Sequence, residues 1–131
     1  RHRDHLDGRA EELLPRELPV FCQPEDEEAL RELGLDARPV AVELDWDGLR
    51  IVRTPARHGH GAVAEALGPV SGYVLDDLYL AGDTVWYDGV ANTIERHRPR
   101  VAVVNEQFAL TLHQSGIPGT VRPVFRLTAA A

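Results

Sequence analysis

The chain contains no methionine and a single cysteine. One thiol, Cys22, cannot form an internal disulfide, which is consistent with a reducing compartment and leads us to expect a cytoplasmic protein. A natural chain normally begins with methionine, whereas this sequence begins with Arg1. We therefore expect a piece of a longer protein or a processed product.

Long apolar runs and an excess of positive charge are also absent. No apolar run approaches the roughly 18 residues that a bilayer-spanning helix needs. The 14 basic and 21 acidic residues give a formal net charge of −7, and the arginines are scattered. Because phosphate backbones are bound by basic faces, nucleic acid is disfavoured as a partner. We expect a small-molecule substrate, no nucleic acid and no membrane, and we leave a homo-oligomer open.

The apolar pattern indicates alternating strands and helices. A chain of 131 residues with 44% hydrophobic content is long enough for one core that buries roughly two-thirds of its unfolded surface. The order of elements predicts an α/β layered domain with a mixed sheet. Strands are predicted at 20–22, 40–44, 49–53, 73–75, 78–80 and 101–104, hairpin turns at 45–48 and 76–77, and helices at 9–14, 24–33, 62–67 and 89–98, the last capped by Asp88.

The first residues combine two imidazoles and a carboxylate, His2, Asp4 and His5, within four positions. A tight loop could turn all three inward, and such a trio usually binds a divalent metal. The alternative interpretation is a frayed, solvated terminus.

Further polar residues follow two predicted strands. His58 and His60 come after the strand at 49–53, and Asp83 ends the strand at 78–80. Strand ends on one edge of an open α/β sheet are where sites assemble. Together with the first cluster, these side chains could bind one or two divalent metals, whose bound water would be acidified toward neutrality.

Several polar or aromatic residues have simpler interpretations. His60 is expected to be a solvated loop residue, and His97 to be a cation that complements a helix dipole. Cys22 is expected to be a buried packing residue. Trp86 could line a substrate pocket, and His113 could serve as a further metal ligand.

Three motifs in this order resemble those of the metallo-β-lactamase-fold hydrolases. They are the H-x-D-H of residues 2–5, the Arg-His-Gly of residues 57–59 and the Ala-Gly-Asp-Thr of residues 81–84. The segments at 70–75 and 81–86 are similar to those of the ascorbate-6-phosphate lactonase-like branch. The resemblance implies a partial domain over 1–105, part of a four-layer αββα sandwich truncated at both ends, and a divergent, poorly organised tail over 106–131.

The resemblance also implies a ligand set. His2 and His58 would bind a first metal, Asp4 and His5 a second, and Asp83 would bridge both. The ion would be zinc (Zn) or manganese (Mn), and Asp4 could also help to orient the nucleophile in a catalytic role.

The implied reaction is attack of a metal-bound hydroxide on an ester, lactone or phosphoester. Two imidazoles of the family pattern have no counterpart, because its first His would precede Arg1 and its last His follows a segment that this chain does not match. The alternative is a non-catalytic fragment or pseudoenzyme of the same fold that lacks a complete metal site.

Overall fold

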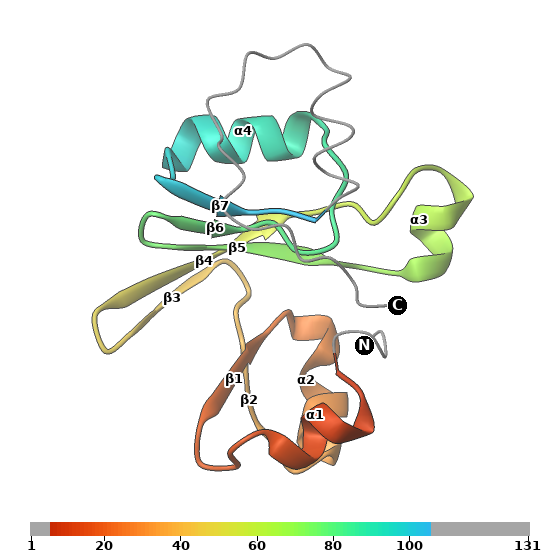
Figure 1. The fold of residues 1–131 in the computed structure, drawn as a ribbon, viewed down its shortest axis with the longest axis vertical. Helices are drawn as coiled ribbons and strands as arrows, with labels where there is room; N and C mark the ends of the chain where they lie inside the picture. The colour runs from red at the N-terminus through yellow and green to blue at the C-terminus, as the bar shows by residue number, and fades with distance from the viewer. Residues whose placement is uncertain (1–5, 106–131) are drawn as a thin grey trace. The chain divides into compact units, whose positions relative to one another are not determined.

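The computed structural model describes residues 6–105, which belong to two compact units (Figure 1). The first unit ends at Ala41 and the second begins at Val42. His2, Asp4 and His5 lie outside the described residues, as do His113 and the rest of 106–131. The predicted division into a domain at 1–105 and a tail at 106–131 therefore stays a prediction.

The first unit contains two parallel strands joined through a short helical segment. The strands pair with Val20 opposite Ala37, and the parallel arrangement requires a crossover connection between them. The side chain of Asp7 accepts a hydrogen bond from the Ala10 amide at 2.7 Å and so caps the first helix. The elements are α1 (Gly8–Leu13), β1 (Pro19–Cys22), the 3-10 turn η1 (Pro24–Asp26), α2 (Glu27–Glu32) and β2 (Asp36–Pro39).

The predicted strand at 40–44 is wrong over 40–42, and only 43–44 belong to a strand. The chain bends at 41–42, so that β2 ends before Val40 and a separate strand begins at Glu43. Val40 is buried and its amide donates to the Cys22 carbonyl at 2.8 Å, whereas Val42 is 70% exposed. The apolar residues that alternate across 40–44 therefore do not lie on one face of one strand. Val40 belongs to the first unit, and Val42 and Leu44 belong to the second.

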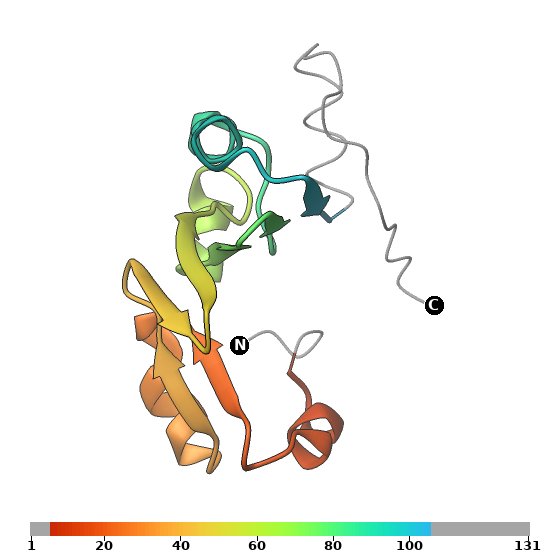
Figure 2. The same cartoon turned by 90° about the vertical axis from the view of Figure 1, so that its left-hand side faces the viewer.

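The second unit is a five-stranded mixed sheet with one helix on a face. The strand order is β3-β4-β5-β6-β7, in which β3 to β6 pair antiparallel and β7 pairs parallel with β6. Both views show α4 against one face of this sheet (Figures 1 and 2). The elements are β3 (Glu43–Trp46), β4 (Leu49–Pro55), α3 (Ala62–Leu67), β5 (Ser71–Leu75), β6 (Leu78–Leu80), α4 (Asp88–His97) and β7 (Val101–Val103).

Two hairpin turns set the register of the sheet. Asp47 and Gly48 have φ of 51° and 84°, and Asp76 has φ of 50°. Positive φ in a short connection matches the twist of the flanking strands, which is why Asp and Gly are favoured there. Both predicted hairpins are confirmed.

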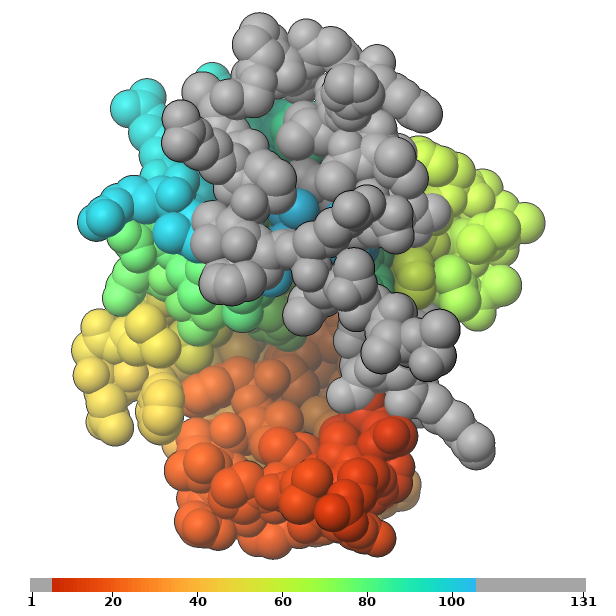
Figure 3. Space-filling view, viewed as in Figure 1, coloured from red at the N-terminus to blue at the C-terminus, as the bar shows by residue number. Residues whose placement is uncertain are grey.

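The helix α3, yellow-green in Figure 3, lies at the side of the unit and exposes Val63.

The core lies between the sheet and α4. Tyr79 is fully buried there, and burial raises its pKa to about 12 despite the opposing interaction with the Thr54 hydroxyl. Gly72 lies beside this pair: a Cβ atom on it would be 2.7 Å from Thr54 Oγ1 and 3.0 Å from the Leu80 carbonyl oxygen. The buried cluster consists of Val52, Val74, Tyr79, Ala81, Val90 and Ala102.

The helix α4 begins differently from the prediction. Tyr87 occupies the N-cap position with an extended backbone and makes no side-chain capping bond, and Asp88 is the first helical residue. Its carboxylate still lies in the first turn, where it complements the helix dipole. Arg98 ends the helix with φ of 46° and donates its amide to the Ile94 carbonyl at 2.8 Å. None of the helices within 6–105 is both long and apolar enough to cross a membrane.

Candidate functional site

Three strands of the second unit end at the same edge of the sheet. Because β4 and β6 are each antiparallel to β5, they run in the same direction, and β7 is parallel to β6. The residues that follow these strands therefore meet at one edge, as the sequence predicted for the two polar loops. Those residues include His58 after β4, Asp83 after β6 and Asn105 after β7.

The His58 and Asp83 loops are hydrogen-bonded to each other. The Arg57 amide donates to Thr84 Oγ1 at 3.0 Å, and the Val85 amide donates to the Arg57 carbonyl at 2.9 Å. Thr84 is fully buried. Arg57, the residue before His58, is thus hydrogen-bonded through both its amide and its carbonyl to Thr84 and Val85, the two residues that follow Asp83. These bonds connect the loops that carry the two candidate ligands.

Asn105 provides a second link at this edge. Its Nδ2 donates to the Gly82 carbonyl at 3.0 Å and approaches the Thr84 carbonyl at 3.4 Å, so it contacts the residues on both sides of Asp83. Gly82 has φ of 65°, and a Cβ atom there would be 3.0 Å from the Ser71 carbonyl oxygen. Sequence reasoning missed the role of Asn105. The available signal was a polar residue directly after an apolar strand.

Arg57 also connects the edge to α4. Its guanidinium carbon lies 4.4 Å from the centroid of the Tyr87 ring, a cation–π contact. Burial raises the pKa of Tyr87, and the charge of Arg57 opposes that rise. Trp86 packs against the core cluster. Its predicted place in a substrate pocket stays a prediction.

The donor chemistry at this edge fits a divalent metal, but the described residues supply few ligands. His58 offers an imidazole nitrogen and Asp83 a carboxylate, and both side chains are partly exposed. No group of three or more His, Cys, Asp or Glu able to bind a metal occurs within residues 6–105. The roles of His2, Asp4 and His5, outside that range, stay predictions.

His60 is exposed, as predicted for a solvated loop residue. Cys22 is buried, as predicted, and burial is the main cause of its raised pKa.

Comparisons with known proteins give relatives of part of this chain. No family model matches it. UPF0173 protein YddR of Bacillus subtilis is 34% identical over 112 residues, which cover 79% of this chain and 44% of that protein. The structure of a possible metal-dependent hydrolase from Veillonella parvula matches with a TM-score of 0.71 and 31% identity, over 79% of this chain and 45% of that one.

An isothiocyanate hydrolase from Delia radicum gut bacteria matches with a TM-score of 0.68 and 30% identity, over the same shares of the two chains, 79% and 45%. The chain therefore spans less than half the length of these relatives. The predicted fold, a mixed-sheet α/β structure that forms part of a metallo-β-lactamase-like domain, is confirmed. The closer resemblance to the lactonase-like branch stays a prediction.

Proposed function

We propose that this chain carries part of the metal site of a metal-dependent hydrolase with the metallo-β-lactamase fold. The observation that carries the proposal is the convergence of the His58 and Asp83 loops at one sheet edge, where Arg57 bonds directly to Thr84 and Val85. The likeness to the structures of a possible metal-dependent hydrolase and of an isothiocyanate hydrolase supports it.

In this proposal His58 and Asp83 bind a divalent ion, zinc or manganese, together with His2, Asp4 and His5. A divalent ion in such a site supplies water activation at neutral pH and stabilises negative charge on the substrate. The protein's own part is positional. The Arg57–Thr84 bond holds the His58 loop, and Asn105 holds the backbone on both sides of Asp83.

The proposed substrates are small esters, lactones or phosphoesters, with a sugar lactone as the specific expectation of the lactonase-like branch. Asp4 would orient the attacking water. Hydrolysis of generic ester, lactone and phosphodiester substrates by the metal-loaded chain distinguishes the three classes.

Metal content tests the binding part of the proposal. We expect zinc or manganese to co-purify with the chain, and we expect His58→Ala and Asp83→Asn each to weaken binding by about tenfold or more, because each removes a ligand. His60→Ala, in the same loop but exposed, is the matched control and should retain the metal. Elemental analysis after dialysis measures the stoichiometry, and a value near zero in the unmodified chain contradicts the proposal.

The second candidate is a non-catalytic fragment or pseudoenzyme. It is favoured by the two imidazoles of the family pattern that have no counterpart in this sequence. This candidate predicts no turnover of any of the substrates above, even when the chain is saturated with zinc or manganese. Turnover that Asp83→Asn abolishes rules it out.

A further inference from the structure

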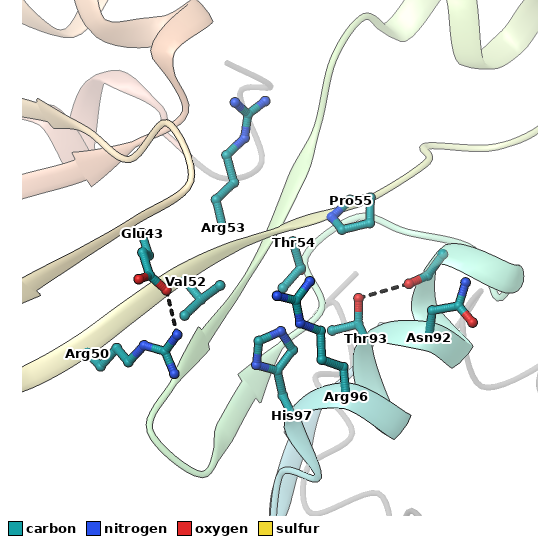
Figure 4. Close-up of a pocket in the computed structure, with 11 residues that line it drawn as sticks. Glu43, Arg50, Val52, Arg53, Thr54, Pro55, Asn92, Thr93, Arg96 and His97 are labelled. Carbon is teal, nitrogen blue, oxygen red and sulfur yellow. Dashed lines mark hydrogen bonds and ion pairs between the residues drawn. The ribbon is translucent and has the colours of Figure 1, made fainter.

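A hollow of about 220 Å³ lies on the α4 face of the second unit, bounded by β3, β4 and α4 (Figure 4). Val52 and Thr54 form its floor on β4, and Asn92, Thr93 and Arg96 line it from α4. None of the residues that line it belongs to the loops at 57–60 or 82–85, so it is separate from the candidate metal edge.

The hollow is basic although the chain as a whole is acidic, with a net charge of −7. Glu43 is the only carboxylate among its lining residues, and it forms an ion pair with Arg50. Arg53 points away from the hollow in Figure 4, and its Nε donates to Ser71 Oγ at 2.8 Å. The positive charge in the hollow that no carboxylate neutralises therefore comes from a side chain in the last turn of α4.

Arg96 carries that charge. Figure 4 shows its side chain extending from α4 toward β4, next to His97. Within residues 6–105 the Arg96 side chain takes part in no ion pair and no hydrogen bond, and the residue is exposed. A guanidinium is planar and presents its donors in a fork that matches an oxyanion. The neighbouring Asn92 amide adds donors on the same side of the hollow.

His97 reports the electrostatic potential of the hollow. Burial lowers its pKa first, and the positive charges of Arg96 and Arg50 lower it further, against the opposing charge of Glu43. The two arginines thus outweigh the single carboxylate at this imidazole. A positive potential that disfavours a cation favours an anion at the same place.

We propose that this hollow binds the phosphate group of a small molecule, with Arg96 as the main contact and Asn92 and Arg50 beside it. Because Arg50 is paired with Glu43, the charge left without a carboxylate partner is that of Arg96. The double charge of a phosphate interacts with this guanidinium more strongly than the single charge of a carboxylate does. The volume suits a phosphate-bearing metabolite rather than a macromolecule.

Titration of the 131-residue chain with inorganic phosphate, at constant ionic strength, tests the proposal. We expect saturable changes in the amide NMR signals of residues 50–54 and 92–97. Arg96→Gln should weaken binding about fivefold or more, because it removes a charge-assisted contact. Arg100→Gln removes the same charge from an exposed residue outside the hollow and should leave binding unchanged.

A second variant, Asn92→Asp, keeps the size of the side chain and adds a repelling charge, so it should also weaken phosphate binding. Thermal melting of each variant, without phosphate, establishes that the fold is retained. Equal effects of Arg96→Gln and Arg100→Gln would indicate non-specific charge screening and overturn the proposal. Equal saturation by acetate, or the absence of saturation by phosphate, would overturn it as well. Neither result bears on the metal site, which shares no residue with the hollow.

Discussion

Single residues determine how closely neighbouring strands of the sheet pack. Gly72 is the clearest case, since a side chain at this position would meet the Thr54 hydroxyl and two backbone carbonyls, those of Leu80 and Ala81. Backbone atoms of a central strand cannot move aside as the end of a flexible side chain can. The sequence placed Gly72 in a motif, but only the structure gives the steric reason for the glycine.

We expect Gly72→Ala to lower the free energy of unfolding by about 1–3 kcal/mol, because the added methyl overpacks a buried site. Urea unfolding followed by tryptophan fluorescence measures the change. Gly8→Ala is the control: nothing lies within 4 Å of that position. A stability loss for Gly72→Ala no larger than that of Gly8→Ala would contradict the packing argument.

His97 shows a limit of sequence reasoning at the same scale. Its place at a helix end predicts a cation that complements the dipole, yet burial and two nearby arginines lower its pKa. A helix dipole favours a cation at a solvated side chain, whereas His97 is partly buried and lies near Arg50 on another element, a proximity that no local pattern indicates.

Because the pKa of His97 is lower in the folded protein, this residue makes the stability of the protein depend on pH. The neutral form is favoured on folding, so its contribution to stability is present above the unfolded pKa of about 6.5 and is lost as the pH falls through the lower folded pKa. Arg96→Gln should raise the folded pKa, because it removes a like charge. NMR titration of the His97 ring protons measures the shift, and a pKa that falls or stays constant in this variant contradicts the assignment.

At the scale of elements, local turn chemistry was predictable and long-range pairing was not. Asp47-Gly48 and Asp76 favour tight turns in any context, so the hairpins followed from the sequence. The strand β2 spans Asp36–Pro39 and contains residues that are rare in strands. It forms because it pairs in parallel with β1. Paired residues of the two strands are 17 positions apart in the sequence, as in the pair Pro19 and Asp36.

The contact between the two loop elements gives a prediction of its own. Thr84→Val keeps the shape of the side chain but leaves the Arg57 amide without its acceptor, so we expect a loss of about 1–2 kcal/mol. Hydrogen exchange at the Arg57 amide should become faster. Thr93→Val is the matched control, because the Thr93 hydroxyl donates to a carbonyl within α4 at 2.8 Å and should not affect Arg57. Unchanged exchange in Thr84→Val would argue against the link.

At the scale of the molecule, the fold class and the edge that collects the candidate ligands were both predictable. The direction of β6 follows from its hairpin with β5, that of β7 from the helical crossover, and that of β4 from its antiparallel pairing with β5 across the connection that contains α3. Together these directions bring His58 and Asp83 to one edge. The bend at 41–42 was not predictable, because apolar alternation continues through it. The bonds made by Asn105 were not predictable either, since they depend on which carbonyls approach its amide.

Removal of metal tests the proposed site on the whole chain. Binding to the folded state alone stabilises it by about 2.7 kcal/mol at a free metal concentration one hundred times Kd. We therefore expect excess zinc to raise the melting temperature and chelation to reverse the change. Asp83→Asn should abolish the response while His60→Ala retains it. An identical response in both variants would place the ion elsewhere.

The two hydrogen bonds from Asn105 have a consequence for the order of events during synthesis. The backbone that flanks Asp83 is held by a side chain located after β7, 22 positions further along the sequence than Asp83 itself (105 against 83). A nascent chain that has released β6 but not yet β7 still lacks the amide that holds this loop. The candidate ligand edge can therefore be completed only after the chain has been synthesised as far as Asn105.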